Sequence, residues 1–173
     1  MLIILCGLPG TGKSTLIRAL AGRSPSAVLD KDAIREAVFG PLHTDYSREQ
    51  DDLCGAMMLS AAGYLLRKDP GLRVYLDGRV YSRGSELRAA VQQAELAAAP
   101  WRILHCVCAE EEVRRRLEEQ SGHPARNRNF DLYLRLKASF EPITLEHLTI
   151  DTGLPLEDCL VKAARYLGIP ENR

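Results

Sequence analysis

Short apolar runs alternate with longer amphipathic or charged runs along the whole chain. Five apolar runs have the length of buried strands, and they cover Leu2–Cys6, Ala27–Asp30, Arg73–Asp77, Arg102–Ala109 and Leu148–Asp151. The runs between them predict helices near Lys13–Ala21, Asp32–Phe39, Ser47–Arg67, Ser85–Ala98, Glu110–Gln120, Phe130–Phe140 and Leu156–Leu167. This alternation is typical of an α/β three-layer sandwich, in which helices cover both faces of a mainly parallel sheet.

The charge balance and the cysteine count narrow the class of protein. The chain has 173 residues, enough for one compact domain with a buried core, and we expect residues 1–173 to form a single unit. Its 23 basic and 23 acidic residues cancel, so no overall positive field would attract nucleic acid. Five scattered cysteines argue against a disulfide framework and favour the reducing cytoplasm. No apolar run approaches the ~20 residues that a membrane span needs.

A glycine-rich stretch after the first apolar run carries the most specific motif. Residues 7–14 read Gly-Leu-Pro-Gly-Thr-Gly-Lys-Ser and fit the pattern G-x-x-x-x-G-K-[ST] between a strand and a helix. In such a P-loop, backbone N–H groups close around phosphate oxygens, and the helix adds the positive end of its dipole. The motif predicts that ATP and Mg²⁺ bind at this loop, through Gly7, Pro9, Gly10, Thr11, Gly12, Lys13, Ser14 and Thr15.

Two residues of this loop have distinct expected roles. Lys13 supplies a point charge to the phosphate oxygens, and the Ser14 hydroxyl is placed to ligate Mg²⁺. Phosphate binding alone does not separate kinases from GTPases, motor ATPases or nucleotide sensors, so the function depends on other segments.

Asp30-Lys31-Asp32 follows the second apolar run, at the strand end where open α/β sheets bind ligands. Transfer of a phosphoryl group to an alcohol needs a group that accepts the hydroxyl proton, and Asp32 is our candidate for this general base. Asp30 could hold the metal through water, and Arg35, one helical turn after Asp32, could bind an anionic acceptor group. Alternatively, Asp30 or Asp32 simply caps the following helix.

A second strand, Arg73–Asp77, also ends in a carboxylate, and Gly78-Arg79 follows it. Asp77 has either a metal-side or an acceptor-binding role, and the sequence does not distinguish the two. We place Asp77 and Arg79 among the acceptor-binding residues.

Together these segments resemble the polynucleotide-kinase-like branch of P-loop kinases, an AAA-type family of ATP-binding predicted kinases. The resemblance runs through nearly the whole chain and rests on residues 7–15, Asp32-x-x-Arg35 with Phe39-Gly40, the strand ending at Asp77, Arg114–Arg116 and Ile150-Asp151-Thr152. It implies a P-loop NTPase fold with a five-stranded sheet and a small helical lid. By the same resemblance, Asp32 matches the general base and Arg35 an acceptor-side contact. Asp30-Lys31-Asp32 is also similar to the D-x-D of shikimate and gluconate kinases, in which the first Asp is on the metal side.

The resemblance places the lid near residues 114–130, with arginines that reach the transferring phosphates. Arg116 fits the first such position. Gln120 stands where the family often has Arg, and Arg126 or Arg128 could supply the missing charge from the loop that follows. A second departure from the family pattern is Gly78-Arg79, where relatives often show Ala-Thr or Thr-Asn. This difference is consistent with an unusual acceptor.

The leading interpretation is an ATP- and Mg²⁺-dependent kinase that moves the γ-phosphate onto a hydroxyl group. The neutral charge and the short chain favour a small-molecule acceptor over a long polynucleotide. Two alternatives stay open: a polynucleotide 5′-hydroxyl kinase, and a nucleotide-dependent switch or ATPase without an acceptor. The sequence indicates neither the identity of the acceptor nor an oligomeric state.

Overall fold

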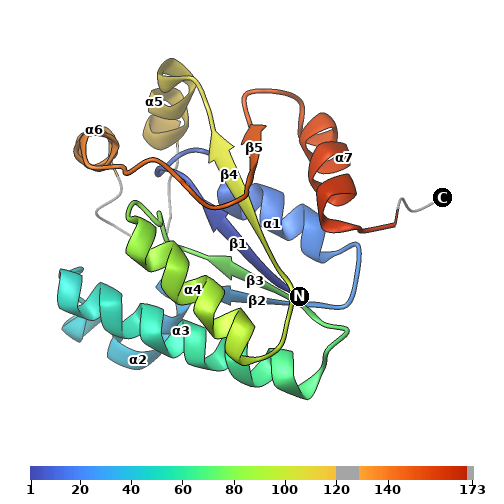
Figure 1. Cartoon of the computed structure of the whole chain (residues 1–173). Helices are drawn as coiled ribbons and strands as arrows, with labels where there is room; N and C mark the ends of the chain where they lie inside the picture. Colours follow the sequence, from blue (N-terminus) through green and yellow to red (C-terminus); the bar gives the residue numbers. More distant parts are fainter. Residues whose placement is uncertain (120–128, 171–173) are drawn as a thin grey trace.

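A parallel sheet lies at the centre of the computed structural model, which describes residues 1–119 and 129–170 (Figure 1). Its strands are β1 (Leu2–Cys6), β2 (Ser26–Asp30), β3 (Arg73–Asp77), β4 (Trp101–Val107) and β5 (Leu148–Asp151). They lie in the order β2-β3-β1-β4-β5, and each neighbouring pair runs parallel. The predicted α/β class with a five-stranded, mainly parallel sheet is confirmed.

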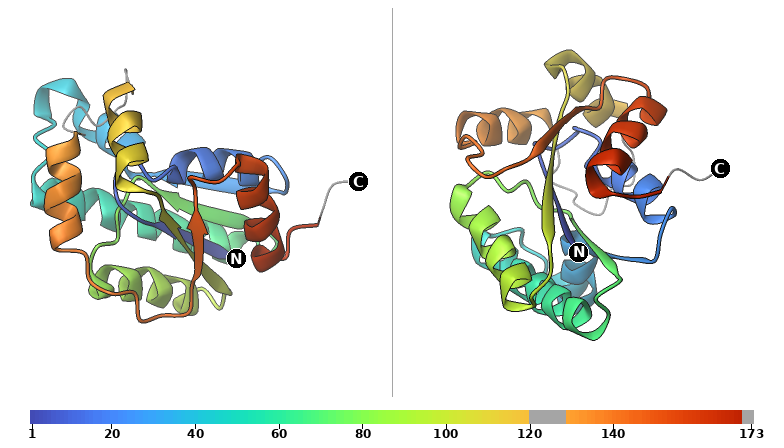
Figure 2. Two further views of the ribbon diagram at one scale, coloured as in Figure 1. Left: turned by 90° about the horizontal axis from the view of Figure 1, so that it is seen from above. Right: turned by 45° about the vertical axis from the view of Figure 1, so that its right-hand side comes forward.

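Helices cover both faces of this sheet, as the views in Figure 2 show. The helices are α1 (Lys13–Ala21), α2 (Lys31–His43), α3 (Arg48–Lys68), α4 (Gly84–Leu96), α5 (Glu110–Glu119), α6 (Phe130–Ala138) and α7 (Leu156–Leu167). Helices α1 and α7 pack in one apolar cluster with the sheet, and α3 and α4 pack in a second cluster on the opposite face. The predicted three-layer arrangement is therefore present.

The central strand β1 explains why the core forms in two halves. Alternate side chains of a strand point to opposite faces. Ile3 and Leu5 accordingly join the cluster under α1 and α7, while Leu2, Ile4 and Cys6 join the cluster under α3 and α4. All five are fully buried, which is why this segment reads as a continuous apolar run rather than an alternating one.

Helix α2 consists of two helical segments joined at a kink. We expected Gly40-Pro41 to end the helix after Phe39, and a kink at Gly40 separates this helix from a short second segment that runs to His43. Gly40 has φ 61° and ψ −179°, which breaks the helical path, and Pro41 can then begin a new turn because the first turn of a helix needs no N–H donor there. The predicted end of the helix at Gly40-Pro41 is therefore confirmed for the first helical segment, whereas the short second segment was not predicted.

The remaining element bounds agree with the sequence pattern to within a few residues. Gln120 and most of the predicted loop Ser121–Asn129 lie outside the described residues, as does the larger part of the predicted lid 114–130. Within the described ranges, none of the helices is both long enough and apolar enough to cross a membrane.

The buried strand β1 yields a stability prediction. Leu5→Ala should lower the free energy of unfolding by about 2–5 kcal/mol, because the change leaves a cavity in a fully packed core. Leu42→Ala is the matched control, since Leu42 is 90 % exposed and the change should stay within about 0.5 kcal/mol. Urea denaturation of the three proteins measures both values. Equal effects of the two substitutions would contradict the placement of β1 at the centre.

Candidate active site

The glycine-rich loop connects β1 to α1 at the carboxyl edge of the sheet. Gly7 has φ +136°, and a Cβ atom there would lie 2.3 Å from the carbonyl oxygen of Cys106, so only glycine fits. Gly12 is the N-cap of α1 in the left-handed conformation, and within the described part of the chain no side chain caps this helix. A helix N-terminus without a side-chain cap favours an anion such as phosphate.

Lys13 and Thr11 fix the shape of the loop from inside. The Lys13 side chain is buried, and its Nζ donates to the carbonyl oxygens of Gly7 at 2.7 Å and Leu8 at 2.9 Å. The Thr11 hydroxyl donates to the Leu8 carbonyl at 2.8 Å. The ammonium group is thus held within the curve of the loop, where a charge-assisted contact to a phosphate oxygen could form.

Two carboxylates stand at the ends of adjacent strands. The register of β2 and β3 pairs Asp30 with Asp77. Asp77 is buried and accepts from the Gly78 N–H at 2.7 Å, while Asp30 accepts from the Asp32 N–H at 2.8 Å and forms the N-cap of α2. Burial raises the pKa of Asp30, and the charges of Asp77 and Asp32 raise it further. Of the two residues considered as helix caps, Asp30 is the one that caps.

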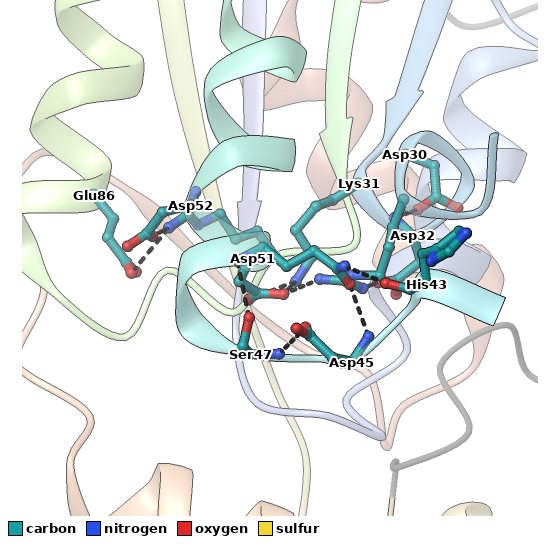
Figure 3. A network of polar contacts seen from close by, with 12 residues as sticks. Asp30, Lys31, Asp32, His43, Asp45, Ser47, Asp51, Asp52 and Glu86 are labelled. Carbon is teal, nitrogen blue, oxygen red and sulfur yellow. Dashed lines mark hydrogen bonds and ion pairs between the residues drawn. The ribbon is translucent and has the colours of Figure 1, made fainter. Parts of the chain in front are cut away.

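A network of ion pairs joins α2 to α3 beside these carboxylates (Figure 3). Arg35 is buried and pairs through Nη1 with Asp32 and through Nη2 with Asp51. Lys31 is also buried, and its Nζ lies 2.8 Å from both carboxylate oxygens of Asp51. Burial lowers the pKa of Lys31 to about 8. We call these four residues the α2–α3 network; in it, Arg35 fixes the orientation of the Asp32 carboxylate.

Arg79 occupies a slot between α3 and α4. Its Nη2 lies 2.8 Å from Asp52 and 3.3 Å from Glu86, one residue from each helix. The slot exists because Gly55 has no side chain: a Cβ atom there would lie 1.8 Å from Nη1 of Arg79. Arg79, which we predicted to bind the acceptor, is therefore held in place by these two carboxylates.

Arg116 reaches from α5 to the segment after β5. Its Nη1 donates to the Thr152 hydroxyl at 3.2 Å, its Nη2 to the Thr152 carbonyl at 2.8 Å, and its Nε to Glu112 at 2.7 Å. The Thr152 hydroxyl lies 3.0 Å from the Thr11 carbonyl oxygen, within the P-loop. Through Thr152, Arg116 is tied to the rim of the phosphate loop.

One cavity of about 1160 Å³ brings most of the predicted site residues together. Its lining includes Pro9, Gly10, Gly12, Lys13, Ser14, Thr15, Asp30, Asp32, Arg35, Asp77, Arg79 and Arg116. Gly7 and Thr11 lie behind this surface in the same loop. Arg126 and Arg128 lie outside the described residues, so their predicted roles stay predictions.

Several residues of the cavity wall escaped the sequence analysis, namely Asp51, Asp52 and Glu86. Asp51 and Asp52 lie in the first turns of α3, just after its N-cap Ser47. Acidic residues are common there because they favour the positive end of a helix dipole. Their sequence context therefore gave no signal that they pair with residues of α2 and of the segment after β3.

Comparison with known proteins supports the same fold. Residues 2–143 match the family described as an AAA domain. An APS kinase of Mycobacterium tuberculosis, solved with AMPPNP and APS, superposes with a TM-score of 0.71 at 16% identity over 96% of this chain and 96% of that chain. A gluconokinase of Sinorhizobium meliloti 1021 has a TM-score of 0.62 at 18% identity, covering 96% of this chain and 90% of that chain.

A third similar structure, Kti12 of Chaetomium thermophilum in complex with ADP-AlF3, has a TM-score of 0.66 at 16% identity. The match covers 99% of this chain and 100% of that chain. No curated protein sequence matches the chain. At these identities the structural likeness shows the fold alone. Since the family match spans most of the sequence, the chain belongs to the AAA domain family, and its fold is the one seen in the APS kinase and the gluconokinase.

Proposed function

We propose that this protein is an ATP- and Mg²⁺-dependent kinase that transfers the γ-phosphate to a hydroxyl group of a small molecule. The observation that carries the proposal is the shared cavity: Lys13 and Ser14 of the phosphate loop and Asp32 of α2 line one space. A nucleotide sensor needs the phosphate loop, but it does not need a carboxylate positioned beside it with room for a second substrate.

The loop residues fit a nucleoside triphosphate. Gly7 and Gly12 keep the backbone clear of side-chain atoms, so N–H groups can approach phosphate oxygens closely. Lys13 adds the positive charge that the β- and γ-phosphates need. Two of the similar proteins were solved with AMPPNP and with ADP-AlF3, which supports the choice of an adenine nucleotide.

The residues beside the loop also fit Mg²⁺ held together with the nucleotide. Within residues 1–119 and 129–170, no group of three or more His, Cys, Asp or Glu side chains could hold a metal on its own. Mg²⁺ typically uses one or two carboxylates, waters and substrate phosphates instead. Ser14 and Asp30 are the residues we assign to it, with Asp77 as a second carboxylate at the same edge. When bound, the ion would neutralise charge on the transferring phosphate.

The transfer step follows from the position of Asp32. Arg35 holds its Oδ1, so we assign Oδ2 to the acceptor hydroxyl. The hydroxyl oxygen forms a bond to the γ-phosphorus, the bond from that phosphorus to the bridging β–γ oxygen breaks, and ADP leaves. The hydroxyl proton passes to Asp32. Arg35 acts through Asp32 and is therefore a positioning residue in this proposal, whereas Arg116 would lie at the nucleotide side, where Thr152 ties it to the loop.

A screen with γ-labelled ATP tests the proposal. Small hydroxyl compounds and a 5′-hydroxyl oligonucleotide are offered in parallel, and we expect label on a small molecule. Lys13→Ala should lower this transfer by about 30-fold or more, because a charge-assisted contact contributes on the order of 2 kcal/mol. Wild-type turnover by Lys13→Ala would contradict the assignment of the phosphate loop.

Two other outcomes of this screen would favour the alternatives. Transfer only to the oligonucleotide would identify a polynucleotide 5′-hydroxyl kinase. Slow ATP hydrolysis that no compound accelerates would identify a switch or an ATPase without an acceptor.

Ser14→Ala tests the metal assignment. The loss of one hydroxyl ligand should raise the Mg²⁺ concentration needed for half-maximal activity while the melting temperature stays close to that of the wild type. Ser85→Ala is a suitable control, since Ser85 is exposed on α4 and outside the cavity lining. If the Mg²⁺ titration curves of all three proteins coincide, Ser14 is not a ligand.

Asp32→Asn separates a general base from a structural residue. We expect ATP affinity to change little and the melting temperature to fall by a few degrees, because buried Arg35 loses the charge of one of its two carboxylate partners. Transfer should fall by roughly 10²–10⁴-fold, as is usual for loss of a general base. Asp77→Asn serves as the comparison at the neighbouring strand end. If transfer survives Asp32→Asn but collapses in Asp77→Asn, the base lies on the segment after β3.

A further inference from the structure

The charged side chains of the acceptor half of the cavity indicate which class of acceptor fits there. We define the acceptor wall as the cavity-lining residues of α2, α3 and α4, of the ends of β2 and β3, and of the segment between β3 and α4. Its charged members are six carboxylates and five cations: Asp30, Asp32, Asp51, Asp52, Asp77, Glu86, Lys31, Arg35, Arg48, Arg79 and Arg83. Asp30 and Asp77 are the carboxylates that we assign to Mg²⁺, so four carboxylates and five cations are left to face the acceptor. What matters for the acceptor is therefore how many of these cations are already paired.

Two of its cations are buried and already engaged. Lys31 holds both oxygens of Asp51, and Arg35 divides its two Nη atoms between Asp32 and Asp51. Withdrawing either cation toward a ligand would break an ion pair of the α2–α3 network, and this is unfavourable above all for Arg35, which is buried between two carboxylates. Neither residue is well placed to serve as the main contact for a phosphate, sulfate or carboxylate group.

Two further cations are paired with carboxylates of the same wall. Arg79 contacts Asp52 and Glu86 from within its slot beside Gly55, and Arg48 lies 3.6 Å from Asp52. Four of the five cations thus face carboxylates that would repel an incoming anion, and Arg83 is the one cation of the wall without an ion pair among the described residues.

A wall of paired charges suits a different kind of ligand. Each carboxylate can still accept hydrogen bonds and each guanidinium can still donate them, so donors and acceptors alternate along the surface. A hydroxyl group is both a donor and an acceptor, whereas an ionised phosphate is only an acceptor. Tyr46 also lines the cavity, with the guanidinium carbon of Arg35 5.2 Å from the centre of its ring, and adds apolar surface to the polar wall.

We infer that the acceptor is an uncharged, multiply hydroxylated small molecule, such as a free sugar or another polyol, and not a phosphorylated or otherwise anionic one. The inference rests on the proposed kinase function and narrows its substrate class. It also gives a role to Asp52 and Glu86, which pair with Arg79 and so make its guanidinium less available to an anion.

A transfer assay with matched pairs of acceptors tests the inference directly. Each pair has one carbon skeleton, for example a hexose and its phosphate ester, so that only the charge differs. We expect kcat/KM for the uncharged member to be at least tenfold higher. Preference for the anionic member, or for a 5′-hydroxyl oligonucleotide, would overturn the inference and leave the kinase proposal intact. Hydrolysis without transfer to any compound would overturn both.

A binding measurement tests the charge argument without catalysis. A non-hydrolysable ATP analogue is added first, and the rise in melting temperature that it causes measures its binding to the phosphate loop. Inorganic sulfate is then titrated at constant ionic strength. The wild type should show no saturable further rise, whereas the variant Asp52→Asn/Glu86→Gln, which unpairs Arg79, should show a saturable rise of several degrees.

The matched control is Glu36→Gln/Glu95→Gln. It also removes two negative charges, but at exposed positions outside the cavity lining. It is needed because sulfate stabilises folded proteins in general. Saturable sulfate binding by the wild type would overturn the inference, as would identical titrations of the Asp52→Asn/Glu86→Gln variant and the control. Failure of the ATP analogue to shift the melting temperature would instead count against the kinase proposal.

Discussion

All five strands run in the same direction, and the position of every candidate functional group depends on that constraint. Parallel strands bring their carboxyl ends to one edge of the sheet, so the segments that follow β1, β2 and β3 meet there. Burial of β1 on both faces helps to keep the strands in this arrangement, since successive side chains of β1 pack alternately in the two apolar clusters. A loss of packing around β1 would therefore disturb the site as well as the core.

The edge of the sheet is divided between two kinds of chemistry. On the nucleotide side, backbone groups dominate: Gly7 and Gly12 open the loop, and Lys13 is held within it by two carbonyl oxygens. On the acceptor side, charged side chains dominate and nearly cancel. Asp51 is central to this second half, because it pairs with both Lys31 and Arg35 and so connects α3 to the helix that carries Asp32.

The candidate site shows which functional residues can be identified from local sequence motifs and which cannot. The P-loop was identifiable because its chemistry is contiguous: glycines, lysine and serine occupy eight consecutive positions between a strand and a helix. Asp30 and Asp77 were identifiable as strand-end residues, although only the register of β2 and β3 shows that they are direct neighbours. Asp52 and Glu86 were missed, because nothing in their own segments distinguishes a helix-surface acid from one that faces Arg79 across a cavity.

The sequence by itself determined the class of fold, the order of strands and helices along the chain and the phosphate loop, since these depend on local periodicity and on residues adjacent in sequence. Only the tertiary structure decided that Arg35 and Arg79 pair with Asp51 and Asp52 of α3. The physical reason is distance along the chain. Arg79 meets Asp52 from 27 positions away, and Arg116 meets Thr152 from 36, so such pairs form only once the helices have packed on the sheet.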